Sequence, residues 1–330
     1  MLPARSAFHK PANYLAALAT VPLAPVFATM RRFRSGKPAP PPAEWRDAVL
    51  IGADHIGDVL FRTVGLDALK VALPECRWHF IASQPGAQLI ETHPALESVI
   101  VADAPVERRS FADRVALLRS RQFDAAVCYD SGDYWRDQMA SASAGIPACV
   151  GYSHKGFPGL ATLVMPYDRP RPYADRFRLL VEFLTGTAIV GPSRPVVHLT
   201  PGDLAAGAGV ASRFEATKPL LAVGITGNQP HGEALKERML ETLAALVKTM
   251  DVQLVFLGAP DDRAEIEERC RRHRLAAANL CGELKPRESV AFLRHARAAF
   301  VVDSGLRHMA NAAGIRVVFF RNLFTFREET

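Results

Sequence analysis

Short apolar runs alternate with longer amphipathic segments from about residue 47 onward. This alternation is typical of strand–helix units built around a parallel sheet. In the first half, strands are predicted at residues 48–52, 78–82, 98–101, 125–129 and 148–151, and helices at 59–73, 86–91, 110–120 and 135–144. In the second half, strands are predicted at 220–225, 252–257, 279–280 and 299–302, and one more follows Gly314 and runs to residue 319. Helices are predicted at 232–250, 262–272 and 286–296.

A proline cluster separates the two series. Pro192, Pro195 and Pro201 lie close together and predict an interdomain linker. The chain has 330 residues and is 49% hydrophobic, which is enough for two cores of ordinary size. We therefore expect an α/β protein with two Rossmann-like domains, at residues 47–190 and 200–330.

The N-terminal arm, residues 1–46, has a different composition. An uncharged stretch from Tyr14 to Met30 contains Pro22 and Pro25 and is followed by a basic cluster, Arg31 to Arg34. Seventeen residues with two internal prolines are a poor bilayer span. A signal peptide and a packed or disordered extension are the alternatives. We favour a peripheral arm on an anionic membrane surface, with its arginines on the head groups and a stiff proline-rich linker at residues 35–43.

Charge and cysteine content narrow the class of protein. The net charge of +6 comes entirely from residues 1–46, because the rest carries 33 basic and 33 acidic groups. The basic pI therefore gives no reason to expect nucleic acid. The five cysteines are dispersed, without metal-ligand spacing, so we expect reduced thiols in a cytoplasmic protein and no metal site.

Two strand-to-helix turns carry candidate chemistry. Asp303, Ser304 and Gly305 follow an apolar run and open a helix that contains His308. An acid and a hydroxyl at a helix start suit a ribose and phosphates, although both residues are also common helix caps. Near the other end of the chain, a second buried strand leads into a turn that contains Gly57 and Asp58.

Together these motifs resemble glycosyltransferase family 9, the ADP-heptose:lipopolysaccharide heptosyltransferases. Residues 54–60 match the family's D-x-I-G-D-x-L turn, and residues 303–312 match its D-[ST]-G-x-x-H-x-x-A-A signature. The resemblance covers roughly residues 47–322 and implies a GT-B architecture, with the reaction in the cleft between the domains. No G-x-G-x-x-G follows a strand, which disfavours a dinucleotide oxidoreductase.

The resemblance also implies roles for individual residues. Asp58 matches the proposed catalytic base, although a helix-capping role fits its position equally well; Asp54 would orient it, and His55 is more typical of a turn residue. The implied donor-binding residues are Thr226, Gly227, Lys236, Asp262, Leu284, Asp303, Ser304, Gly305 and His308, with a packed helix residue as the alternative for His308. Basic groups on predicted loops are candidates for acceptor binding, namely Arg136, His154 and Lys155. Ordinary solvated loops are the alternative.

The chain departs from the family pattern in two places. The phosphate loop lacks the usual K-x-W-P: His231 stands near the lysine's position and Lys236 lies one helical turn further on. Arg321 and Asn322 replace the usual Gly-Pro before the C-terminus. We expect an inverting, metal-independent glycosyltransferase that moves a sugar, by the resemblance a heptose, from a nucleotide sugar such as ADP-heptose to a lipopolysaccharide-core acceptor at the inner membrane. The alternative is a catalytically inactive homologue that binds nucleotides or partners.

Overall fold

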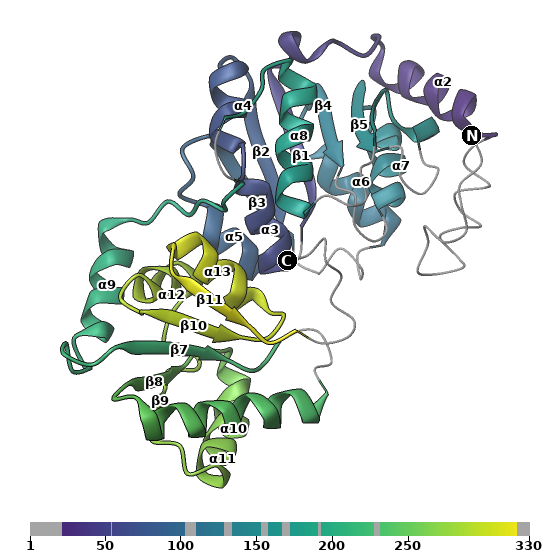
Figure 1. Cartoon of the computed structure of the whole chain (residues 1–330). Helices are drawn as coiled ribbons and strands as arrows, with labels where there is room; N and C mark the ends of the chain where they lie inside the picture. Colours follow the sequence, from purple (N-terminus) through teal and green to yellow (C-terminus); the bar gives the residue numbers. More distant parts are fainter. Residues whose placement is uncertain are drawn as a thin grey trace.

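The computed structural model describes residues 22–53, 55–102, 110–128, 134–152, 158–166, 172–190, 193–227 and 232–321. They form two α/β units, one above the other in Figure 1, that are joined by an extended segment running to α9. Both sheets are parallel throughout the described residues. The predicted fold class, two Rossmann-like domains of the GT-B kind, is confirmed.

The first sheet has the strand order β3-β2-β1-β4-β5-β6. Its strands are β1 (Asp47–Ala53), β2 (Arg77–Ala82), β3 (Leu96–Val101), β4 (Ala125–Cys128), β5 (Ala148–Tyr152) and β6 (Leu163–Met165). The helices around it are α3 (Ile56–Thr63), α4 (Leu66–Ala72), α5 (Gln84–Ile90), α6 (Phe111–Arg119), α7 (Tyr134–Ala144) and α8 (Tyr173–Thr185).

The second sheet has the strand order β11-β10-β7-β8-β9. Its strands are β7 (Leu220–Gly224), β8 (Gln253–Phe256), β9 (Ala277–Asn279), β10 (Ala298–Val301) and β11 (Arg316–Phe319). Its helices are α9 (Pro201–Ala211), α10 (Glu233–Thr249), α11 (Arg263–Arg272), α12 (Pro286–Leu293) and α13 (Gly305–Ala313).

Several elements differ from the sequence-based prediction, among them helix α9, which begins at Pro201, directly where the predicted linker ends. The single helix expected at residues 59–73 is two helices, because Gly65 adopts a left-handed φ of 97° between α3 and α4. Strand β6 and helix α8 were not predicted. The first has only 3 residues, too few for a periodic signal.

Part of the N-terminal arm packs on the first unit. Helix α2 (Ala24–Ser35) lies against α7, and the side chain of Arg31 is buried. Its guanidinium donates hydrogen bonds to the carbonyl oxygens of Ile146 at 2.7 Å and Leu160 at 3.1 Å. The expectation that the basic cluster from Arg31 to Arg34 lies on membrane head groups is therefore wrong for Arg31, because its guanidinium is buried and donates its hydrogen bonds inside the protein. Among the described residues, no helix is both long and apolar enough to cross a bilayer.

The two units share an apolar core and several polar links. One buried cluster contains Val59 and Leu60 of α3 as well as Leu306 and Met309 of α13. On the α12 side, Arg287 donates to the backbone oxygen of Gln88 at 2.5 Å and pairs with Glu91 in the first unit. It also pairs with Asp203 of α9 at 2.9 Å. These contacts hold α3 and α5 of the first unit against α13 and α12 of the second (Figure 1).

Candidate active site

The strand orders locate a binding position in each unit. In the first sheet the chain goes from β1 outward to β2 and β3, and then returns to the other side of β1 with β4. In the second sheet it goes from β7 to β8 and β9, and returns to the other side of β7 with β10. Ligands of open α/β sheets bind at the carboxyl ends of the strands where the order reverses. These positions are the ends of β1 and β4, and of β7 and β10.

Asp58 lies at the first of these positions. Helix α3 begins at Ile56, shortly after β1 ends, and Asp58 is in its first turn and half-buried. An acid in the first turn of a helix is stabilised by the helix dipole and by the unpaired N–H groups there. Asp54, which the sequence predicts to orient Asp58, lies outside the described residues.

Ser304 and Gly305 lie at the second position, directly after β10. Ser304 is the N-cap residue of α13, with an extended backbone, but its side chain makes no capping hydrogen bond. Its Oγ is buried and has no hydrogen-bond partner among the described residues. A hydroxyl that neither caps its own helix nor reaches solvent is well placed to bind a ligand, because buried polar groups are normally paired. The ordinary-cap alternative therefore does not describe Ser304.

The two turns meet across the junction of the units. A Cβ atom on Gly57 would lie 2.6 Å from Cδ2 of His308, and one on Gly305 would lie 3.0 Å from Cβ of Ile56. The rings of Phe61 and His308 pack edge to face with centroids 4.6 Å apart. Close approach therefore explains the glycine at position 57, and a side chain at position 305 would be tightly packed; the helix starts that carry Asp58 and Ser304 are neighbours.

His308 is part of this packing. It is 7% exposed, and burial together with the adjacent Arg307 lowers the pKa of His308 to about 3. Nη2 of Arg307 lies 3.2 Å from Nε2 of His308, which suits donation to a neutral ring. The packed-helix alternative thus describes the contacts of His308 among the described residues; donor binding by its ring stays a prediction.

Arg307 is a residue that sequence reasoning missed. Its guanidinium is buried, lies 3.2 Å from Oδ1 of Asp303 and stacks over the ring of Phe319 at 4.6 Å. It therefore fixes the carboxylate of Asp303 beside the start of α13. The available signal was the spacing of an acid, Asp303, and an arginine four residues later, across the predicted helix start.

The loops after β7 and β8 are tied together at the same edge of the second sheet. Oγ1 of Thr226 donates to Oδ2 of Asp262 at 2.8 Å, and the N–H of Ala259 donates to the same oxygen at 2.7 Å. Among the described residues, Oδ1 of Asp262 accepts no hydrogen bond. This leaves it available to a ribose hydroxyl. Leu284 is half-buried and packs against the shared core.

The predicted phosphate-binding lysine and the predicted acceptor-binding residues are not part of the contact between the two turns. Nζ of Lys236 lies 2.8 Å from Glu265 and 3.8 Å from Glu233, so in this structure its charge is paired within α10 and α11. Arg136 stacks over the ring of Trp135 at 5.3 Å, in the first turn of α7. His154, Lys155 and His231 lie outside the described residues.

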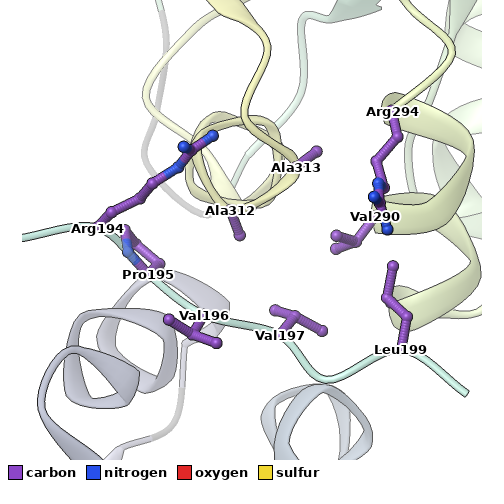
Figure 2. Close-up of a pocket in the computed structure, with 9 residues that line it drawn as sticks. All are labelled: Arg194, Pro195, Val196, Val197, Leu199, Val290, Arg294, Ala312 and Ala313. Atoms are coloured by element: carbon purple, nitrogen blue, oxygen red, sulfur yellow. The ribbon is translucent and has the colours of Figure 1, made fainter.

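A hollow of about 290 Å³ lies elsewhere, between the linker and helices α12 and α13. Figure 2 shows its apolar wall and two arginines. It adjoins Ala312 and Ala313 at the C-terminal end of α13, whereas Ser304 and Gly305 lie at the N-terminal end. It is therefore separate from the junction of the two turns.

Two parallel α/β units of the Rossmann kind that pack against each other form the GT-B architecture. Within this class, residues 210–320 match the family model of Glycosyltransferase family 9 (heptosyltransferase). The match confirms the family recognised from the sequence, so the chain is a glycosyltransferase whose second unit carries a family 9 domain. None of the curated protein sequences compared with the chain matches it.

Solved structures agree with the fold. The glycosyl transferase family 9 protein from Veillonella parvula is 18% identical, with a TM-score of 0.71 over 85% of this chain and 82% of that one. ADP-heptose lps heptosyltransferase II of E. coli is 19% identical, with a TM-score of 0.62 over 83% of this chain and 84% of that one. Heptosyltransferase WaaC of E. coli, with ADP-2-deoxy-2-fluoro heptose, is 17% identical, with a TM-score of 0.60 over 83% and 88%.

Proposed function

We propose that the chain is an inverting heptosyltransferase that moves a heptose from ADP-heptose to a lipopolysaccharide-core-type acceptor. The observation that carries the proposal is the meeting of two helix starts at the junction, one with Asp58 and the other with the unpaired hydroxyl of Ser304. A sugar transfer needs a base on one side of the anomeric carbon and stabilisation of the departing phosphate on the other.

The donor's diphosphate is assigned to the start of α13. Backbone N–H groups at a helix N-terminus and the helix dipole favour an anion there, and Oγ of Ser304 adds a donor. The adenosine ribose is assigned to Asp262, whose Oδ2 is held by Thr226 and Ala259, with Leu284 against the base. The choice of ADP-heptose draws on a similar structure, E. coli WaaC, which is described with ADP.

The transfer itself is a single displacement. The carboxylate of Asp58 takes the proton of the acceptor hydroxyl while its oxygen forms a bond to the anomeric carbon. The bond between that carbon and the diphosphate oxygen breaks on the opposite face, and ADP leaves with the electron pair. The configuration at the anomeric carbon is inverted, and the start of α13 stabilises the negative charge that develops on the leaving group.

The acceptor is assigned to the first unit, where Arg136, His154 and Lys155 would bind its phosphates.

Membrane association is assigned to α2 and its N-cap residue, where Leu23, Val26 and Phe33 are 44%, 59% and 88% exposed. Apolar side chains at helical spacing beside an exposed arginine suit the cytoplasmic face of an anionic bilayer. Sedimentation with anionic vesicles tests this: Phe33→Ser should weaken binding, and equal binding by the variant contradicts the role of α2.

The catalytic proposal is tested with Asp58→Asn. General-base catalysis contributes about 10²–10⁴-fold, so transfer from ADP-heptose to a heptose-deficient core should fall by about that factor. Stabilisation of the variant by ADP in a thermal-shift assay should stay as in the wild type. Asp113→Asn is the matched control, because Asp113 is also a first-turn acid, on α6, and its loss should leave transfer unchanged.

The transfer and thermal-shift assays together distinguish an active transferase from an inactive, nucleotide-binding homologue. Full activity of Asp58→Asn refutes the base, whereas a loss of ADP stabilisation in Ser304→Ala supports the donor site. Stabilisation by ADP without transfer by the wild type favours the inactive, nucleotide-binding homologue. A flat response to ADP, UDP and GDP refutes the donor site altogether.

A further inference from the structure

Three side chains with metal-binding atoms meet where the interdomain linker crosses the first unit. Asp67 comes from the first turn of α4, His93 from the loop between α5 and β3, and His198 from the extended linker. Their ligand atoms all lie within 4.8 Å of one another. The cluster is separate from the proposed transferase site, whose residues lie on α3, α13 and the loops of the second sheet.

The two imidazoles carry unused nitrogen atoms. Nε2 of His93 and Nε2 of His198 are both buried and have no hydrogen-bond partner among the described residues. His93 is 3% exposed, and the rings meet edge to face with centroids 4.4 Å apart. Two buried, unpaired nitrogens side by side are costly unless a common ligand satisfies them.

We infer that Asp67, His93 and His198 form a binding site for one divalent transition-metal ion of the zinc type. Two imidazole nitrogens and one carboxylate oxygen are a common zinc donor set, and water completes a tetrahedral shell. Asp67 is exposed, which provides an entry path and the side on which water binds.

The geometry requires only a small adjustment. Oδ1 of Asp67 lies 4.0 Å from Nε2 of His93, whereas ligands at about 2.0–2.2 Å from one zinc ion lie roughly 3.4 Å apart. Rotation of the exposed Asp67 side chain supplies most of this difference. Because the three ligand atoms lie within 4.8 Å of one another, the histidine side chains must also approach each other by up to about 1.4 Å to share one ion.

One hydrogen bond of His93 determines which of its ring nitrogen atoms carries the proton. The N–H of Ala95 donates to Nδ1 at 3.2 Å, which places the ring proton on Nε2. To bind a metal through Nε2, the ring must carry its proton on Nδ1, so it loses this hydrogen bond and has to turn away from the N–H of Ala95.

A metal bound at this site would restrain the interdomain linker. Oγ1 of Thr92 already donates to the backbone oxygen of His198 at 2.5 Å. A metal bound by His198 and by two ligands of the first unit would hold the linker to that unit more firmly. Movement between the units would then begin after His198, in the short stretch before α9.

The test is a cobalt titration of the full-length, tag-free protein after chelation. Co²⁺ in a site with nitrogen ligands gives visible absorption bands, which we expect to saturate at one equivalent and to disappear when Zn²⁺ is added. Losing a partner that only orients a metal ligand costs roughly 10–100-fold in affinity, so His198→Gln and His93→Gln should each cost at least that. Asp67→Asn should weaken binding at least tenfold. Zn²⁺ should raise the Tm of the wild type and not that of His198→Gln.

The matched control is His295→Gln, an exposed histidine of the second unit, which should bind cobalt as the wild type does. Unchanged affinity in His198→Gln and Asp67→Asn, or the absence of cobalt bands in the wild type, overturns the inference. These two positions are less buried than His93, so they decide the outcome even if His93→Gln does not fold.

Discussion

Gly57→Ala tests the contact on which the proposed site depends. The added methyl group would lie 2.6 Å from Cδ2 and 2.8 Å from Nε2 of His308, well inside van der Waals contact. His308 cannot easily move away, because it is 7% exposed and its ring packs on Phe61. The two units must therefore separate locally, or α3 must shift its first turn.

The expected magnitude follows from two opposing terms. Inserting a methyl group into a packed interior costs about 1–3 kcal/mol. Replacing glycine by alanine in a helix gains up to about 1 kcal/mol, and less in the first turn, where Gly57 lies. The free energy of unfolding should therefore fall by about 1–2 kcal/mol. Because a displacement of about 1 Å can cost 10²-fold in rate, transfer should fall by a factor of ten or more.

A double-mutant cycle in urea measures the contact directly. Gly57→Ala, His308→Ala and the double variant are compared with the wild type; the methyl group fits the space that the ring vacates, so the two changes should couple by about 1–2 kcal/mol. Gly209→Ala in α9 is the matched control, because a Cβ there meets no atom within 4 Å. It should be neutral or stabilising. Additive effects of Gly57→Ala and His308→Ala would refute the reasoning.

Three further predictions concern stability. Arg31→Met should lower the free energy of unfolding by roughly 1.5–3 kcal/mol, because buried carbonyl oxygens lose a charged donor; an unchanged urea midpoint contradicts this. Arg287→Gln should cost at least about 1 kcal/mol, since the pair with Glu91 is partly exposed whereas Asp203 is buried and loses a charged partner, and added salt should shrink the part of the difference that is due to Glu91. The pKa of His308 is lowered in the folded state from its ordinary 6.5 to about 3, so the unfolded chain binds the proton first. The stability linked to His308 should be full above pH 6.5 and decline by up to about 1.4 kcal/mol per pH unit toward pH 3. His308→Gln should lack this decline when its free energy of unfolding is measured against pH. The same pH profile in the variant and the wild type would contradict the burial argument.

Local patterns in the sequence predicted much of the architecture. Apolar runs such as residues 220–225 identify buried strands, because a strand between two helical layers must be apolar on both faces. Glycine and the acid–hydroxyl pair at residues 303–305 identify a helix start that suits phosphates. The short strand β6 and the break at Gly65 were not predicted, because 3 residues carry no period and a glycine within a helical pattern is ambiguous.

The chain's sequence by itself determined the α/β class, the two strand series and the two motif turns, because each depends on neighbours a few residues apart. Only the tertiary structure decided that these turns touch, that Ser304 leaves its hydroxyl unpaired, and that Arg31 is buried rather than facing outward. It also placed Asp67, His93 and His198 together, although they come from three separate segments. Such contacts depend on how two sheets and their linker pack, and packing joins residues whose separation in the chain carries no periodic signal.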